Sequence, residues 1–242
     1  MSTVRFTLIL LILLVAGCGR SAEPTPEPTA TLGADSDENG ASASGGMSAD
    51  DPSTLTIVAM GDSLTDGYGL DREDAYPAQL EQKLLADGYP VRVVNAGISG
   101  ETSSGARTRT EWVLTEQPDL LILLTGGNDG LRGIDPSVTA QNIDEMLAIF
   151  QDNGVTVILG GMQIVQNMGA DYVEAFRAIY PAAAEKHDVL LVPFFLEGVG
   201  GVPELNQPDQ IHPTAEGYGI VVETIYPYVV EAINAHLALA GR

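Results

Sequence analysis

From residue 54 onward, short aliphatic segments alternate with longer segments of helical spacing. The aliphatic segments are rich in Val, Ile and Leu and are bounded by Gly, Pro, Asn or Asp, which is typical of buried β-strands. They predict five strands, at 54–60, 91–96, 119–125, 155–160 and 189–194. The other segments predict five helices, at about 74–87, 103–117, 138–153, 170–186 and 214–239. Strands that alternate with helices are joined by right-handed crossovers, so the pattern predicts an α/β fold whose parallel sheet is covered on both faces.

The helix expected at 138–153 has the clearest start signal. Asp135 can cap its first turn, and Pro136 fits the first helical position. The spacing places five apolar side chains on one face, Val138, Ile143, Met146, Leu147 and Phe150. We expect this face to pack against the sheet.

The first 18 residues have the layout of a secretory signal rather than of a core element. Arg5 is followed by an apolar run, 6–16, that is too short to cross a bilayer comfortably, and then by small residues. The segment Val15 to Cys18 resembles the bacterial lipobox, which predicts that Cys18, the only cysteine, receives lipid. An ordinary signal peptide with a chance cysteine and an uncleaved anchor are the alternatives.

Charge and composition divide the remaining chain into a tether and a domain. Residues 19–53 are rich in Pro, Ser, Thr, Gly and acids, so we expect a disordered tether. Residues 54–242 carry 26 acidic against nine basic residues, a net charge of −17. Such a domain repels nucleic acid and anionic lipid. We therefore expect an extracytoplasmic protein held to a bacterial cell membrane or outer membrane by the lipid on Cys18.

Four polar or glycine-rich segments follow predicted strands at the edge where a doubly wound sheet binds ligands. GDSLTDG follows the first strand and carries Ser63, and NAGISGET follows the second strand. TGGNDG follows the third, and QPDQIHPT lies between the fifth strand and the last helix. Because these segments meet at one edge, they predict a single site. The alternative is that Gly, Asp and Ser only build turns there.

Acyl transfer requires a hydroxyl nucleophile, a base, an acid that orients the base and donors to the oxyanion. His212 is the candidate base, because Asp209 lies three residues before it in a loop stiffened by two prolines. We expect His187 and His236 to be solvated surface residues.

Three groups are candidate donors to the oxyanion. They are the amide of Ser63 at the start of a helix, the amide of Gly100 and the side chain of Asn128. We expect Asp62 to brace the turn before Ser63. The alternative is that the glycines and Asn128 only shape turns.

GDSL at 61–64, ISGET at 98–102, GGND at 126–129 and DxxH at 209–212 resemble the four sequence blocks of the SGNH (GDSL) hydrolases. The chain is most similar to the bacterial branch that includes thioesterase I, lysophospholipase L1 and arylesterase. The resemblance implies a three-layer α/β/α sandwich with a flavodoxin-like five-stranded parallel sheet. It also implies Ser63 as nucleophile, His212 as general base and acid, Asp209 as its partner, and Ser63, Gly100 and Asn128 as the oxyanion hole.

The sequence predicts the substrate less directly than it predicts the catalytic residues. The loops after the third to fifth strands offer apolar residues for an acyl groove, Leu131, Ile134, Met162, Ile164, Phe194 and Phe195. Ordinary core packing is the alternative for each of them. We expect aryl or fatty acyl esters, thioesters or lysophospholipids as substrates, no cofactor or metal, and a monomer. Deacetylation of envelope polysaccharide is the runner-up.

Two further classes of function are weighed against the esterase. A two-metal phosphoesterase could use oxygen and nitrogen ligands from Asp62, Asp66, Asn128, Asp129, Asp209 and His212, but such sites usually contain several histidines. A binding protein on an inactive hydrolase scaffold is the other, although every catalytic group is present.

Overall fold

The structure is a computed structural model that describes residues 54–164 and 168–240. The predicted signal peptide, the lipidation at Cys18 and the tether 19–53 lie outside the described residues. Among the residues that the structure describes, none of the helices is long and apolar enough to cross a membrane.

Five parallel strands form one sheet in the order β2-β1-β3-β4-β5, which confirms the predicted flavodoxin-like arrangement. The strands are β1 (Leu55–Gly61), β2 (Val91–Gly97), β3 (Leu120–Leu124), β4 (Thr156–Gly160) and β5 (Leu190–Val192). Their ends lie within two residues of the predicted bounds. The five residues of β3 are all buried, because a central parallel strand is covered by helices on both faces.

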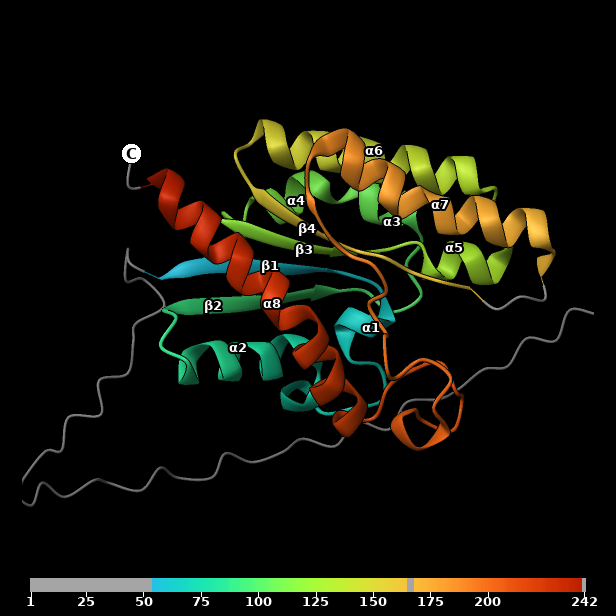
Figure 1. Cartoon of the computed structure of the whole chain (residues 1–242), viewed down its shortest axis with the longest axis horizontal. Helices are drawn as coiled ribbons and strands as arrows, with labels where there is room; N and C mark the ends of the chain where they lie inside the picture. The colour runs from blue at the N-terminus through green and yellow to red at the C-terminus, as the bar shows by residue number, and fades with distance from the viewer. Residues whose placement is uncertain (1–53, 165–167, 241–242) are drawn as a thin grey trace, which may run out of the picture. The chain divides into compact units, whose positions relative to one another are not determined.

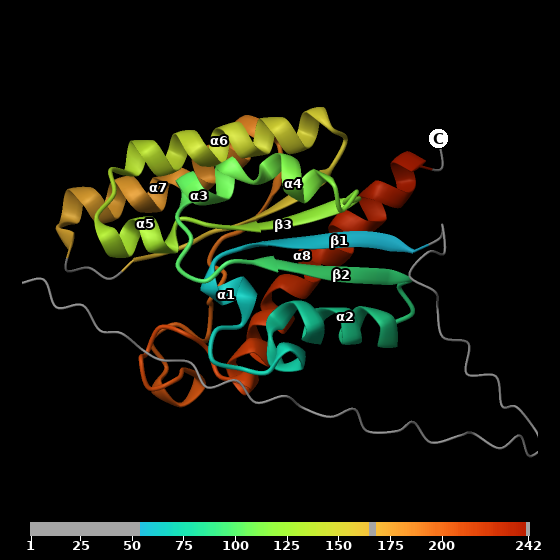
Figure 2. The ribbon, with the colours of Figure 1, turned by 180° about the vertical axis from the view of Figure 1, so that it is seen from behind.

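The helices form two layers around the sheet (Figures 1 and 2). Helices α2 (Tyr76–Ala86) and α8 (Ala215–Ala240) cover one face. The other face is covered by α3 (Ser103–Thr108), α4 (Thr110–Leu114), α6 (Pro136–Asp152) and α7 (Ala170–His187). Two short helices, α1 (Ser63–Asp66) and α5 (Gly127–Arg132), start directly after β1 and β3. The 3₁₀ turns η1 (Arg72–Asp74) and η3 (Pro203–Leu205) lie in loops.

Helix α6 starts as predicted, although one of its apolar residues is not part of the core. The Asp135 carboxylate accepts a hydrogen bond from the amide of Ser137, and Pro136 is the first helical residue. Ile143, Met146, Leu147 and Phe150 are fully buried, but 39% of Val138 is exposed, so its assignment to the core face was wrong. Val138 lies five residues before Ile143, which turns it about 140° away from Ile143 around the helix axis.

The single helix expected at 103–117 is interrupted at Arg109. The backbone of Arg109 leaves helical geometry (φ −108°, ψ 11°) and separates α3 from α4. Its guanidinium binds the carboxylate of Glu101 through Nε and Nη2, and Nη2 also donates to the carbonyl of Gly61, at 3.2 Å. Helical periodicity does not report such a tertiary contact, so the pattern predicted one continuous helix.

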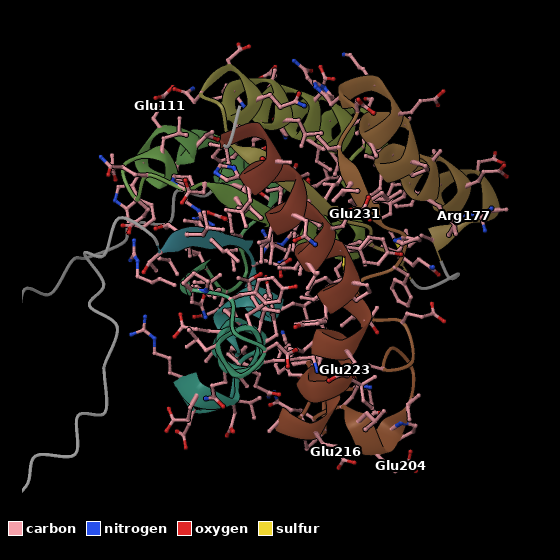
Figure 3. All side chains as sticks on the ribbon, turned by 60° about the vertical axis from the view of Figure 1, so that its left-hand side comes forward. Glu111, Arg177, Glu204, Glu216, Glu223 and Glu231 are labelled. Atoms are coloured by element: carbon pink, nitrogen blue, oxygen red, sulfur yellow. The ribbon has the colours of Figure 1, made fainter. Side chains whose placement is uncertain are left out.

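Part of the negative charge of the domain lies on the exposed face of α8. Figure 3 labels Glu216, Glu223 and Glu231 along α8, and all three are exposed. Intervals of seven and eight residues place them on one face of the helix, opposite its buried apolar face.

Candidate active site

Ser63 lies where the buried strand β1 turns into helix α1. Asp62 caps this helix, because its Oδ1 accepts a hydrogen bond from the amide of Leu64, at 3.0 Å. The first amides of a helix have no acceptor within the helix. Ser63 therefore carries its hydroxyl and a free backbone amide at the carboxyl edge of the sheet, and no described residue accepts from that amide.

Asp209 and His212 lie in a tight turn between β5 and α8. An antiparallel bridge joins Asn206 to Pro213, and the amide of Gln207 donates to the carbonyl of His212, at 2.7 Å. The side chain of Asn206 is buried and donates to two carbonyls of the preceding loop, at 2.8 Å each. These bonds hold the turn that carries both side chains.

The structure brings Ser63, His212 and Asp209 into one hydrogen-bonded chain. Nε2 of His212 lies 2.8 Å from Oγ of Ser63, and Nδ1 lies 2.7 Å from Oδ2 of Asp209. Since an ionised carboxylate only accepts, Nδ1 donates to Asp209 and Nε2 is left to accept the serine proton. The hydrogen bond with His212, together with the amides of Ile211 and His212, lowers the pKa of Asp209 to about 2. The carboxylate is therefore ionised at neutral pH.

Gly100 and Asn128 complete the expected set of oxyanion donors. Gly100 has a φ of +79°, which a residue with a side chain rarely adopts, and an added Cβ would meet only the side chain of Arg132 within 4 Å. Its amide has no described acceptor, and its carbonyl accepts from Arg132, at 2.8 Å. Nδ2 of Asn128, in the first turn of α5, lies 3.3 Å from Oδ2 of Asp62. The site can therefore offer two backbone amides and one side-chain amide to a developing oxyanion.

Buried polar contacts hold these donors in place. The carboxylate of Asp129, next to Asn128, is fully buried and accepts from the amide and hydroxyl of Ser103 and from the hydroxyl of Thr139. The ion pair of Glu101 and Arg109 ties the loop after β2 to the end of β1. Neither contact was predicted, because single polar residues in a sequence carry no signal of their tertiary partners.

The triad opens onto a cavity of about 480 Å³, within the usual range for small-molecule sites. Its apolar walls are Leu64, Tyr68, Leu131, Met162, Ile164, Phe194, Leu196 and Ile211. Four of the six residues predicted for an acyl groove are among them. Phe195 is not, since it is fully buried and packs edge to face on Tyr76. Ile134 does not line the cavity either, and its carbonyl accepts from Tyr172.

Both other histidines differ from the prediction, because each is paired with an aspartate rather than free in solvent. His187 is the last residue of α7, and 11% of its side chain is exposed. Its Nε2 lies 2.7 Å from Asp144. Nε2 of His236 lies 3.6 Å from Asp119. Neither contacts the site.

The carboxylates proposed for a two-metal site do not converge. Within 54–164 and 168–240, no three His, Cys, Asp or Glu side chains are grouped as metal ligands. Asp129 binds Ser103 and Thr139, and Asp66 accepts from the hydroxyl of Ser99, at 2.5 Å. The residues present therefore do not fit that kind of metal centre.

Comparisons with known proteins agree with this geometry. Residues 59–220 match the GDSL-like Lipase/Acylhydrolase family. Esterase TesA of Pseudomonas aeruginosa is 42% identical over 173 residues, which cover 71% of this chain and 86% of that protein. An arylesterase of Vibrio mimicus is 35% identical over 192 residues, covering 79% of this chain and 94% of that protein. A crystal structure of TesA superposes with a TM-score of 0.71 at 41% identity and covers 74% of this chain and 99% of that chain.

The fold and the family place the chain among the serine hydrolases that act on carboxylic esters. It belongs to the GDSL-like lipase and acylhydrolase family.

The pKa of Asp62 leads to a prediction about the oxyanion hole. Asp62 is 4% exposed, and burial raises its pKa to about 6 despite the hydrogen bonds from Leu64 and Asn128. An ionised Asp62 accepts from the amide of Asn128 through Oδ2, and protonation weakens this contact because the carboxyl group loses its charge. We expect Asp62→Asn to lower kcat by about tenfold, because the donor is retained but less well oriented. As pH falls through about 6, Asp62 becomes protonated and the advantage of the wild type over the variant should disappear, which the ratio of their kcat/KM values measured from about pH 4 to about pH 8 would show.

The same variant should not be destabilised at neutral pH. Because the pKa of Asp62 is raised above its ordinary value of 3.8, the folded protein binds more protons than the unfolded chain between about pH 4 and pH 6. This group therefore lowers the free energy of unfolding as pH rises through that window, by about 3 kcal/mol. Asp62→Asn should match or exceed the wild type in urea unfolding at pH 8. Full activity of the variant at pH 8, or a ratio of the two kcat/KM values that does not change with pH, would contradict the role of Asp62.

Proposed function

We propose that the chain hydrolyses carboxylic esters through Ser63, His212 and Asp209 and that its preferred acyl groups are longer than acetyl. The observation that carries the proposal is the hydrogen-bonded chain from Ser63 Oγ through His212 to Asp209, which opens onto an apolar cavity. Relatives named as an esterase and an arylesterase support the same chemistry.

The mechanism follows from the order of these contacts. Oγ of Ser63 attacks the ester carbonyl carbon while its proton passes to Nε2 of His212. The carbonyl oxygen becomes an oxyanion that accepts from the amides of Ser63 and Gly100 and from Nδ2 of Asn128. When the intermediate collapses, the bond to the leaving oxygen breaks and His212 returns the proton to that oxygen. Water then attacks the acyl-enzyme by the same steps, releasing the acid and restoring Ser63.

The cavity supports a preference for acyl groups that are longer than acetyl. Met162 and Ile164, which follow β4, and Phe194 and Leu196, which follow β5, line it together with Leu131 of α5. Each methylene buried from water contributes about 0.8 kcal/mol, so a chain that lies against these residues gains binding energy with length. Fatty acyl esters, thioesters and lysophospholipids share this acyl part. Deacetylation of polysaccharide is the alternative, since it needs no such cavity.

A series of p-nitrophenyl esters from acetyl to dodecanoyl tests this function. We expect kcat/KM to rise by about two- to fourfold for each added methylene until the chain fills the cavity. Ser63→Ala is the blank at every length, and EDTA should have no effect. Turnover of the acetyl ester alone would contradict the acyl preference and favour the deacetylase. No turnover by the wild type would favour a binding protein.

The location of the enzyme is a separate proposal. An apolar run followed by small residues and Cys18 supports a lipid-anchored, extracytoplasmic protein, tethered by residues 19–53. The acidic outer face of α8 in Figure 3 supports attachment by lipid rather than by charge, because anionic membranes repel it. At such a location, envelope lipids or imported esters are accessible and intracellular acyl-CoA is not. The intact mass of the mature chain tests for diacylglycerol on Cys18.

The proposed working form is a monomer, because the described residues of one chain supply every group of the site.

A further inference from the structure

Two exposed apolar residues, Tyr68 and Ile211, line the cavity together with His212. The ring of Tyr68 lies 4.8 Å from that of His212, centroid to centroid, with a tilt of 42° between the planes. Ile211 directly precedes His212, and both apolar residues line the cavity. Tyr68 is 52% exposed and Ile211 is 45% exposed, so neither contributes much to the core. Exposed apolar surface at the mouth of a cavity commonly marks a binding surface.

The backbone holds Tyr68 at this position. Its amide donates to the carbonyl of Ser63, at 3.1 Å, and its carbonyl accepts from the side chain of Gln207, at 2.7 Å. The neighbours Gly67 and Gly69 have φ values of 84° and 80°. The ring is thus fixed between helix α1, which carries the nucleophile, and the turn that carries His212, although its exposed surface has no packing role in the fold.

The chemistry of the reaction says which part of the substrate meets these two residues. His212 takes the proton of Ser63 and returns it to the leaving oxygen, so that oxygen must come within hydrogen-bond reach of Nε2. The group attached to the leaving oxygen then lies beside the imidazole, where Tyr68 and Ile211 are. The oxyanion points to Gly100 and Asn128, which leaves the walls that follow β4 and β5 for the acyl chain.

We infer that Tyr68 and Ile211 form the subsite for the leaving group and that this subsite favours flat aromatic alcohols. The inference rests on the proposed function and adds the identity of the residues that select the alcohol. An aromatic leaving group can pack against the exposed ring of Tyr68 on one side and the branched side chain of Ile211 on the other. An aliphatic alcohol of equal acidity lacks the aromatic part of that contact.

The test compares two esters with the same acyl group, phenyl butanoate and hexafluoroisopropyl butanoate, whose alcohols are of similar acidity. The measured quantity is the ratio of their kcat/KM values, which is independent of the fraction of correctly folded enzyme. We expect Tyr68→Ala to lower the phenyl preference by about three- to tenfold, Ile211→Ala to lower it less, and Tyr68→Phe to keep it. Leu131→Ala, on the acyl side, should leave the ratio unchanged, as should the remote exposed variant Leu85→Ala.

A second measurement separates selection of the alcohol from positioning of His212. Decay of the butanoyl-enzyme, followed by rapid mixing, no longer involves the leaving group and should proceed at the same rate in Tyr68→Ala. If both esters lose activity equally and this decay slows, Tyr68 positions His212 and the subsite is overturned. An unchanged ratio in Tyr68→Ala overturns it as well. If the wild type hydrolyses neither ester, the proposed function itself fails and the subsite with it.

Discussion

Replacing Ser63 with alanine is expected to lower kcat for ester hydrolysis by about 10⁵- to 10⁶-fold. The loss is large because Oγ of Ser63 is the nucleophile that forms the covalent acyl-enzyme. His212 and Asp209 contribute to catalysis only by activating this nucleophile. Oγ of Ser63 forms the bond to the acyl carbon. It lies 2.8 Å from Nε2 of His212, and its proton passes to that nitrogen. Initial rates with p-nitrophenyl butanoate, on protein purified free of host esterases, measure the effect.

Controls for the Ser63 variant address folding and the loss of a hydroxyl. Ser63 is the first residue of α1 and its side chain is not part of the core, so thermal unfolding should be nearly unchanged. Ser137→Ala removes an exposed hydroxyl on α6 and should retain wild-type rates. A fluorophosphonate probe should label the wild type and Ser137→Ala, but not Ser63→Ala. Activity of Ser63→Ala within tenfold of the wild type would mean that another nucleophile performs the reaction.

Asp209→Asn is expected to lower kcat by about 10⁴-fold while leaving the fold intact. The asparagine keeps the size of the side chain, but its amide can donate to Nδ1 and so stabilise the tautomer whose Nε2 carries the proton. In that tautomer Nε2 cannot accept the proton of Ser63. The carboxylate also stabilises the imidazolium formed during the reaction, and the neutral amide does not.

Measurement of the Asp209 variant includes a charge-matched control. Asp71→Asn removes an exposed carboxylate that forms no cap hydrogen bond and should keep full activity. The lowered pKa of Asp209, about 2, means that its contribution to stability is present above about pH 4 and is lost as pH falls through 2. The side chain is exposed, so this contribution is small after solvent screening. A loss of less than tenfold in kcat would show that His212 is oriented by its surroundings without Asp209.

The sheet could be predicted because strand formation here depends on local pattern. Segments such as 120–124 are continuous aliphatic runs between polar residues, and a chain with no polar side chains there has few alternatives to a buried strand. Alternation with helices then requires parallel pairing, which the observed order confirms. The break at Arg109 was not predictable, because it depends on Glu101 and the carbonyl of Gly61, which are distant in sequence or outside the helix.

The candidate site could be predicted as a set of residues but not as a geometry. Ser63, Gly100, Asn128 and the DxxH turn follow different strands, and parallel strands end at one edge, so their approach follows from topology. The topology does not predict which apolar residues face the cavity. Phe194 lines the cavity while Phe195 is fully buried, and adjacent positions of one loop differ only in the direction of the side chain.

The sequence by itself determined the order of strands and helices along the chain, the candidate nucleophile, base and acid, and the acidity of the domain. These depend on local composition and on spacing along the chain. Only the tertiary structure shows that Asp62 accepts from Asn128, that Arg109 pairs with Glu101 at the break between α3 and α4, and that Tyr68 lies against His212. Each of these contacts joins residues from different elements, and its energy depends on a distance and a burial that exist only once the chain is folded.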